Sequence, residues 1–71
     1  MQPDLLARLG NRIRTLRRRL EWTQAELAER AGIDRSFLAD VERGKRNVSI
    51  LNLALIAESL GVTLAQLFSR I

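Results

Sequence analysis

Residues 23–44 read TQAELAERAGIDRSFLADVERG, and this stretch decides the fold. It opens on Thr23, followed three residues later by Glu26. This is the capping box, in which the two side chains satisfy each other's free backbone N–H groups at a helix start. Gly32 comes where a helix end favours a left-handed residue, and Asp34 is expected to cap the next helix. The stretch therefore predicts two short helices joined by a tight glycine turn.

The second of these helices, expected from Asp34 to about Arg43 with Gly44 ending it, has two different faces. At 100° per residue, its inner side carries Phe37, Leu38, Val41 and Glu42. Its outer side carries Arg35, Ser36, Ala39, Asp40 and Arg43. A slim, charged outer face is unsuited to core packing, so this helix is expected to present it to a partner. Two such helices form a helix-turn-helix.

The N-terminal part of the chain is also expected to be helical, because its apolar residues recur at helical spacing and the one proline stands at position 3. We predict a helix over residues 4–20. Its core-facing stripe consists of Leu6, Leu9, Ile13, Leu16 and Leu20. Its opposite face, expected to be solvated, carries Arg8, Arg12, Arg18 and Arg19.

The C-terminal part carries more apolar surface than the core of a small domain needs. A helix over residues 49–60 has one stripe made of Ile50, Leu53, Ile56, Ala57 and Leu60. A second stripe on the same helix consists of Leu51, Ala54 and Leu55. A second capping box at residues 63–66 starts a short helix with Leu64, Leu67, Phe68 and Ile71. Residues 1–71 are thus predicted to form one compact all-α domain of five helices.

Composition limits the function. The 71 residues are 46% apolar and 28% charged, as in a globular domain, and contain neither cysteine nor histidine. Disulfides, thiolate chemistry, the commonest general base and the commonest metal ligand are therefore missing. We expect no enzyme, metal or cofactor, and a chain this short leaves no room for a domain that binds a small-molecule ligand. With no long apolar run and no signal-peptide pattern, a cytoplasmic protein without membrane contact is expected.

The charge distribution points to a polyanion as partner. Net charge is +4, and eleven of the twelve cations are arginine. Residues 1–46 hold eleven cations and seven anions, whereas residues 47–71 hold only one of each. A basic part joined to an apolar part suggests one surface for nucleic acid and another for packing. An ordinary solvated surface is the alternative that charge alone leaves open.

The outer face of the helix at 35–43 suits the base edges of a DNA major groove. Arg35 can present a bidentate fork to guanine O6 and N7, Ser36 can donate or accept, and Ala39 can contact a thymine methyl. For Asp40 three roles are considered: accepting from cytosine N4, orienting Arg35 or Arg43, or repelling phosphates. We favour orientation. The predicted phosphate contacts, which fix register without reading sequence, are Gln24, Arg43, Lys45, Arg46 and Asn47.

Three stretches of the chain resemble a known family: TQAELAERAGI, DRSFLADVERGKRNVS and the pattern L-x-x-I-A-E-S-L-G-V. Over about residues 12–68 the sequence is similar to the lambda-repressor-like, Cro/CI-type helix-turn-helix family. Within that family it most resembles the controller proteins of restriction–modification systems. Two positions depart from the family's pattern, since Glu21 replaces a frequent glycine and Val48 a frequent proline. A left-handed Glu21 costs about 1 kcal/mol or more.

This resemblance implies a transcriptional regulator that binds double-stranded DNA as a homodimer on a near-palindromic operator, and that contacts RNA polymerase if it is an activator. It implies that Gln24 contacts a phosphate and that Arg17 and Glu42 form a structural salt bridge. It also implies a dimerisation surface in about residues 48–71. The residues expected there are Leu51, Leu55, Leu64, Leu67, Phe68 and Ile71.

A second function is consistent with the same residues. An antitoxin-type module uses such a fold to hold a protein partner as well as its own operator, and the surplus leucines after residue 48 fit that role equally well. Binding of the arginine-rich helix 4–20 to a membrane surface is less favoured, since the proposed core needs its narrow apolar stripe.

Overall fold

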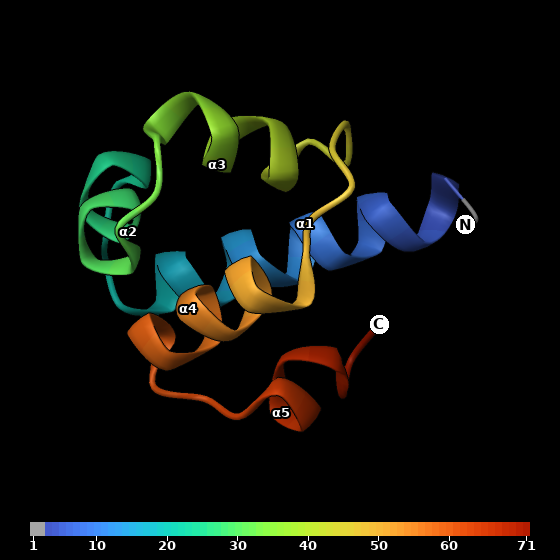
Figure 1. The fold of residues 1–71 in the computed structure, drawn as a ribbon. Helices are drawn as coiled ribbons and strands as arrows, with labels where there is room; N and C mark the ends of the chain where they lie inside the picture. Colours follow the sequence, from blue (N-terminus) through green and yellow to red (C-terminus); the bar gives the residue numbers. More distant parts are fainter. Residues whose placement is uncertain (1–2) are drawn as a thin grey trace.

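The computed structural model describes residues 3–71, which fold into five α-helices without a strand (Figure 1). In chain order they are α1 (Pro3–Arg19), α2 (Gln24–Ala31), α3 (Arg35–Glu42), α4 (Ile50–Leu60) and α5 (Leu64–Phe68). The predicted all-α, five-helix fold is confirmed. Within the described part of the chain, none of these helices is both long enough and apolar enough to cross a bilayer.

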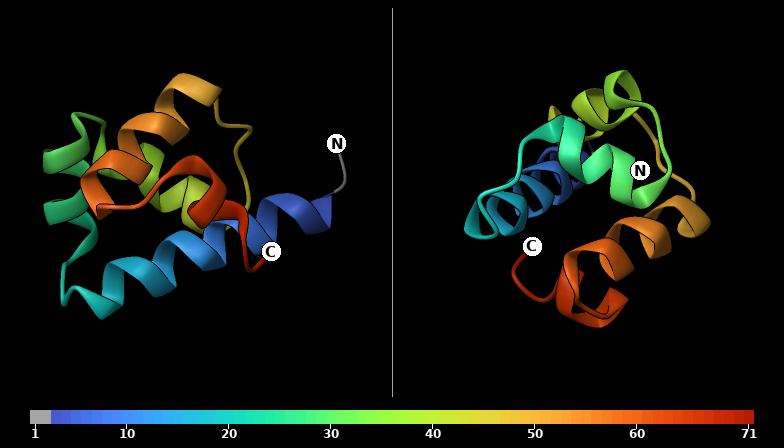
Figure 2. Two further views of the ribbon diagram at one scale, coloured as in Figure 1. Left: turned by 90° about the horizontal axis from the view of Figure 1, so that it is seen from below. Right: turned by 90° about the vertical axis from the view of Figure 1, so that its left-hand side faces the viewer.

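Each of the five helices contributes at least one fully buried side chain to a shared core. The largest of these in each helix are Ile13, Leu27, Leu38, Ile56 and Leu67. The core lies between α1 and the other helices, with α3 on one side of the molecule and α5 on the opposite side (Figures 1 and 2). Because every helix is anchored there, the surfaces of α3 and of α4–α5 point in different directions.

The predicted turn chemistry is formed at both capping boxes. Thr23 accepts from the Glu26 backbone N–H at 3.1 Å, and its own N–H donates to the Glu26 carboxylate at 2.9 Å. Gly32 then ends α2 in the left-handed conformation at φ 70°. Asp34 occupies the N-cap position of α3 with extended backbone, but its side chain accepts no capping hydrogen bond. The prediction that Asp34 caps this helix is therefore correct for the position and wrong for the bond.

The end of α1 differs from the predicted helix over residues 4–20. The helix ends at Arg19, and Glu21 follows with a left-handed φ of 61°. That turn carries Leu20 away from the apolar stripe, and Leu20 is 43% exposed instead of lying in the core. The strained backbone at Glu21 is the cost of a sharp turn into α2 without glycine.

The start of α4 also corrects the prediction. Ser49 caps the helix by accepting from the Asn52 backbone N–H at 3.1 Å, and Leu53 and Ile56 are buried as expected. Ile50 is 68% exposed, although its spacing places it on the same stripe. As the first helical residue it lies beyond the edge of the core, where no neighbouring helix covers it.

Candidate nucleic-acid interface

The helix α3 is fixed by its inner face and exposed on its outer one. Leu38, Val41 and Glu42 are buried, whereas Arg35 and Ser36 are exposed. The remaining outer residues are Ala39 and Asp40, both half-buried, and Arg43, which is exposed. This is the division that the sequence predicts, and it leaves α3 along one edge of the molecule (Figure 1).

Two glycines allow the end of α3 to lie directly on α1. A Cβ atom at Gly10 would stand 2.4 Å from the Val41 carbonyl oxygen, and one at Gly44 would stand 2.6 Å from the Ala7 Cα. Gly44 also has a φ of 73°. The sequence reading missed the role of Gly10. An isolated glycine inside a helical pattern was the available signal, since such a residue often marks a close packing contact.

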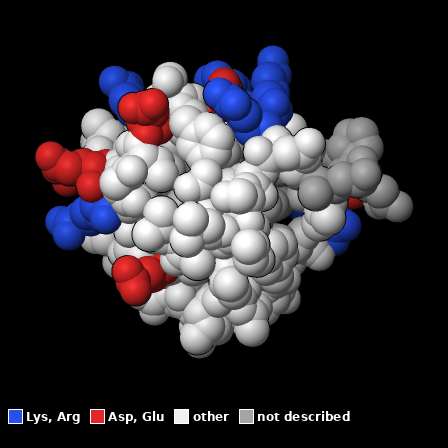
Figure 3. Space-filling model, viewed as in Figure 1, with Lys and Arg blue, Asp and Glu red and all other residues white. Residues whose placement is uncertain are grey.

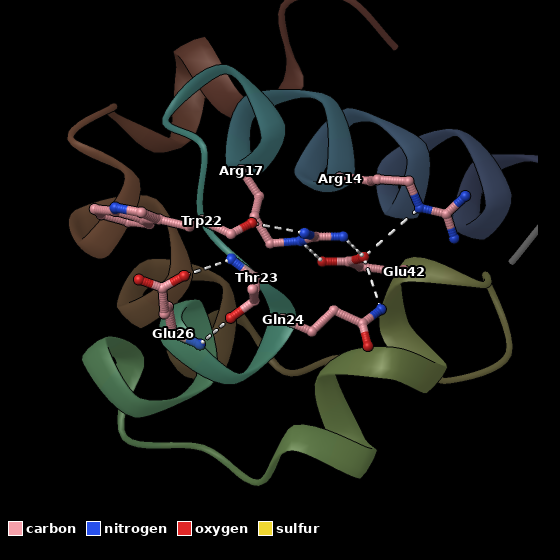
Figure 4. A network of polar contacts seen from close by, with 7 residues as sticks. All are labelled: Arg14, Arg17, Trp22, Thr23, Gln24, Glu26 and Glu42. Carbon is pink, nitrogen blue, oxygen red and sulfur yellow. Dashed lines mark hydrogen bonds and ion pairs between the residues drawn. The ribbon is translucent and has the colours of Figure 1, made fainter.

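Glu42, at the end of α3, is the centre of a buried polar network (Figure 4). Arg17 of α1 binds it with two hydrogen bonds, Nε to Oε2 at 2.8 Å and Nη2 to Oε1 at 2.9 Å. Arg17 also donates to the Trp22 carbonyl at 2.8 Å. The pair implied by the resemblance is thus present, and it ties α3 and the turn before α2 to α1.

Two further residues join this network on its more exposed side. Gln24 donates through Nε2 to Glu42 Oε1 at 3.0 Å, and Arg14 Nε lies 3.6 Å from the same oxygen. Gln24 is predicted from the sequence to contact a phosphate, and no role is predicted for Arg14. Arg14 lies one turn before Arg17 on the same side of α1, which is the spacing that could have suggested it.

The network also sets the ionisation of its members. Burial would raise the pKa of Glu42, but hydrogen bonds from Arg17 and Gln24 and the charges of the two arginines outweigh it, so this pKa lies below its ordinary value. The hydrogen bond to Glu42 raises the pKa of Arg17. Both groups are therefore charged at neutral pH, and the site has a fixed geometry there.

A second, exposed cluster lies at the C-terminal end of α3. Asp40 Oδ1 binds Arg43 Nη2 at 2.5 Å, and Asp40 Oδ2 lies 4.0 Å from Arg46 Nε. The Arg46 guanidinium also stacks over the Phe37 ring, 5.1 Å from its centroid. Of the roles considered for Asp40, this geometry fits the orientation of Arg43, with Arg46 in place of Arg35 as the other partner.

The predicted phosphate contacts lie around this face. Arg43, Lys45, Arg46 and Asn47 are exposed at the end of α3 and in the loop that follows it. Figure 3 shows basic atoms gathered there, along the upper edge of the molecule. Gln24 is half-buried at the start of α2 and is held by Glu42. Within residues 3–71 no three His, Cys, Asp or Glu side chains gather to hold a metal ion.

The predicted dimerisation residues have unequal exposure. Leu51 is 67% exposed, Phe68 38% and Leu55 36%. Leu64 and Ile71 are half-buried against the core. Leu67 is fully buried and belongs to the core, so its assignment to a partner surface is wrong. Leu67 and Phe68 both lie on α5, but the side of α5 that carries Leu67 packs against α1 and α4.

Comparison with known proteins gives consistent matches over nearly the whole chain. The helix-turn-helix family model matches residues 13–67. The control protein C.MunI of Mycoplasma sp is 41% identical over 69 residues, covering 96% of this chain and 93% of that protein. The control protein C.SmaI of Serratia marcescens is 31% identical over 67 residues, covering 94% and 80%. The crystal structure of the restriction-modification controller protein C.AhdI from Aeromonas hydrophila has a TM-score of 0.87 and 41% identity, covering 89% of this chain and 96% of that one.

Proposed function

This chain belongs to the helix-turn-helix family and is a DNA-binding transcriptional regulator, and from that premise we propose that it acts as a homodimer on a near-palindromic operator. We propose further that it is a controller protein of a restriction–modification system. Similarity to C.MunI, C.SmaI and C.AhdI over nearly the full chain supports this. Such a protein works by binding and not by catalysis, and it works inside the cell, where the operator is.

The outward face of α3 is the observation that carries this proposal. Its inner face is pinned to α1 by the Arg17–Glu42 pair, so the position of the outer face is fixed before DNA arrives. In a major groove, Arg35 reads a guanine and Ser36 an adjacent base edge, while Ala39 contacts a thymine methyl. A preorganised helix avoids the ordering cost that a mobile one pays on binding.

The phosphate contacts of the proposal surround α3. Arg43 and Arg46 hold the backbone on one side, and Asp40 keeps their guanidinium groups in place. Lys45 and Asn47 extend this contact along the loop. On the other side Gln24 keeps one amide hydrogen and its backbone N–H for a phosphate, while its bond to Glu42 fixes its direction. These contacts set register, whereas the base contacts give specificity.

The dimensions of the fold support a dimer. The Cα trace extends 28 × 23 × 21 Å, whereas successive major grooves on one side of a duplex are about 34 Å apart. One copy therefore reaches one half-site, and a near-palindrome needs two. The proposed dimer surface lies within residues 48–71. It consists of the exposed Leu51, Leu55 and Phe68 and the exposed parts of the half-buried Leu64 and Ile71. Figure 3 shows that the surface over α4 and α5 carries few charges.

Selection of bound duplexes from a random DNA library at physiological salt tests the proposal. An enriched near-palindrome, with half-sites about one helical turn apart, is expected. Affinity for it should fall steeply with salt, because phosphate contacts release counterions. A folded protein that enriches no sequence would refute the operator-binding proposal.

Arg35→Ala tests the base-reading role within the same experiment. We expect a loss of about 1–3 kcal/mol in operator affinity and a relaxed preference at one base pair in each half-site. Lys45→Ala is the matched control, since loss of a phosphate contact weakens binding to all sequences alike and lowers the salt slope by about one. If Arg35→Ala weakens all sequences equally, Arg35 contacts a phosphate and not a base.

A second function, that of an antitoxin-type protein-binding module, is favoured by one observation. Ile50 and Leu51 are each about two-thirds exposed at the start of α4, more than any other large apolar residue among residues 3–71. Sizing of the purified protein separates the two functions. A stable dimer occupies the α4–α5 surface, whereas a monomer leaves it free for another protein. If the protein is an activator, it also has to contact RNA polymerase.

A further inference from the structure

A basic hollow lies on the side of the molecule where α1 meets the end of α5. It holds about 210 Å³ and is lined by Arg8, Asn11, Arg12, Thr15, Arg19 and Arg70. Four of these six side chains are arginine, and no Asp or Glu lines the hollow. At about 30 Å³ per water in the liquid, it has room for roughly seven waters, and so for more than one phosphate group.

The hollow is separate from the proposed DNA-reading surface. Arg8, Arg12 and Arg19 are spaced four and seven residues apart, which places them along one side of α1. Gly10 and Arg17, which contact α3, lie on the opposite side of the same helix. Figure 2 shows the end of α5 beside α1, away from α3. A duplex lying on α3 therefore does not reach the hollow.

Part of the hollow is rigid before any ligand binds. Arg12 donates from Nε to the Leu67 carbonyl at 3.2 Å and from Nη2 to the Gln66 carbonyl at 2.9 Å. Arg8 donates to a main-chain oxygen of Ile71, the last residue of the printed sequence, and lies 3.4 Å from the Asp4 carboxylate. Carbonyl groups fix the direction of a guanidinium without cancelling its charge. The charge of Arg12 thus stays available in the hollow, whereas that of Arg8 is partly neutralised by Asp4.

The other two arginines complete the charge without being held. The side chains of Arg19 and Arg70 form no hydrogen bond or ion pair within residues 3–71, and both residues are exposed. Asn11 and Thr15 add neutral donors between the arginines. Planar guanidinium groups with neutral donors between them match the oxygens of phosphate, which accept several charge-assisted hydrogen bonds at once.

We propose that this hollow on α1 is a binding site for phosphate groups, distinct from the helix-turn-helix surface. Phosphate comes from two sources, a free oligophosphate or the backbone of a second DNA segment, and the same hydrogen-bonding chemistry recognises both. Because Arg12 also holds α5 and Arg8 holds Ile71 just beyond it, a bound phosphate lies against the helix that carries part of the proposed dimer surface.

The first arm of the test uses inorganic tripolyphosphate as the probe, in calorimetric titration at constant ionic strength. Saturable binding to the native protein is expected, and Arg19→Gln should weaken it about three- to fivefold. Arg19→Gln/Arg70→Gln should weaken it by about tenfold or more. Neither residue holds α5, so both variants should keep the native circular dichroism spectrum and melting temperature.

Matched controls remove the same charge from outside the hollow. Arg18 neighbours Arg19 at the end of α1 and is also exposed, but it does not line the hollow. Arg30, exposed in the last turn of α2 with its guanidinium over the Trp22 ring, also lies outside the hollow. Arg18→Gln and Arg18→Gln/Arg30→Gln should each change tripolyphosphate affinity by less than about twofold. Equal losses in the hollow and control variants would mean general attraction to a basic protein, and would overturn the proposal.

The second arm tests DNA as the source of phosphate. The selected operator is first saturated with protein, and a second, unrelated duplex is then titrated in. If Arg19→Gln/Arg70→Gln weakens binding of the second duplex and the Arg18 controls do not, the phosphate bound in the hollow comes from a DNA backbone. Absence of specific binding in both arms overturns the proposal. Operator affinity should be unchanged in all of these variants. Failure of the operator-binding proposal, seen in the selection experiment, can therefore be told apart from failure of the phosphate-site proposal.

Discussion

The two sides of α1 use the same residue type in opposite ways. Toward α3, Arg17 meets a buried carboxylate, with Arg14 close to the same oxygen. Toward α5, Arg12 meets backbone carbonyl oxygens, and the Arg19 side chain meets no hydrogen-bond or ion-pair partner within residues 3–71. The first side holds a charge that is neutralised and fixed. The second accumulates positive charge at the surface.

The difference lies in the partner and not in the arginine. A buried guanidinium with its carboxylate is costly to form and costlier to break singly, so it acts as a structural joint. An exposed guanidinium on carbonyl groups contributes modestly and keeps its charge available to a ligand. The α3 side of α1 thus determines the position of the proposed recognition helix. The α5 side supports the C-terminal helix and offers a surface for anions.

The largest effect is expected when the Glu42 carboxylate is removed from the α3 side of α1. Glu42→Gln keeps the shape of the side chain but leaves the charge of Arg17 buried without a counter-ion. We expect a loss of about 3–5 kcal/mol in the free energy of unfolding, measured by urea denaturation. Glu29→Gln, on the exposed face of α2, is the control and should change stability by less than about 0.5 kcal/mol.

A double substitution shows whether the pair itself is responsible. Arg17→Gln/Glu42→Gln removes both charges, so it should be clearly less destabilising than the sum of the two single changes. Strict additivity would show that the two residues stabilise the fold independently, and would contradict the role of the pair as a joint.

The same carboxylate gives the α3 side a pH dependence. The pKa of Glu42 in the folded protein lies below that of an unfolded glutamate, which is about 4.3. The unfolded chain therefore binds more protons near pH 4, and acid favours unfolding. The stabilisation from Glu42 is present above about pH 4.3 and is lost as the pH falls through its folded pKa.

Unfolding in urea between about pH 7 and pH 3 checks this dependence. The gap in unfolding free energy between the native protein and Glu42→Gln should narrow as the pH falls below about 4. The other carboxylates titrate in both proteins, so their contribution cancels in the difference. A gap that stays constant would mean that Glu42 ionisation does not contribute to folding.

Much of the fold follows from local sequence chemistry. The capping boxes at Thr23 and Thr63 and the glycine turn at Gly32 are formed by side chains and backbone a few residues apart. The buried side of α3 follows from helical spacing. Such features need no knowledge of how the helices pack, which is why the sequence predicted them.

The errors concern residues whose environment depends on distant neighbours. Periodicity gives the face on which Leu20, Ile50 or Leu67 lies, but not where the adjacent helix ends or what covers that face. Arg12 was expected in solvent, yet it bonds to carbonyl groups more than fifty residues away. A long, flexible side chain of this kind reaches partners that local spacing cannot indicate. The proposed DNA contacts depend on a partner and remain predictions.

Gly10 offers the next test, because it lies on the α3 side of α1. Alanine normally stabilises a helix by roughly 0.5–1 kcal/mol relative to glycine. Here the added Cβ would stand 2.4 Å from the Val41 carbonyl oxygen and 2.5 Å from that of Glu42. We expect Gly10→Ala to destabilise the protein by about 1–3 kcal/mol instead, measured by urea denaturation. A stabilised variant would show that α1 and α3 separate easily, and that contact at Gly10 does not position α3.

The smallest expected effect is on the α5 side. Arg12→Gln removes the hydrogen bonds to the Leu67 and Gln66 carbonyls, and a shorter amide does not reach both. These bonds are only partly buried, so the loss in unfolding free energy should be about 1 kcal/mol.

Hydrogen exchange of the backbone amides locates the change. The backbone amides of α5 should lose protection while those of α3 keep it, because the Glu42 network is untouched. Arg18→Gln, an exposed arginine on the same helix, should alter neither. Equal loss of protection in α3 and α5 would mean that the two sides of α1 are one cooperative unit, and the contrast between them would then describe geometry and not stability.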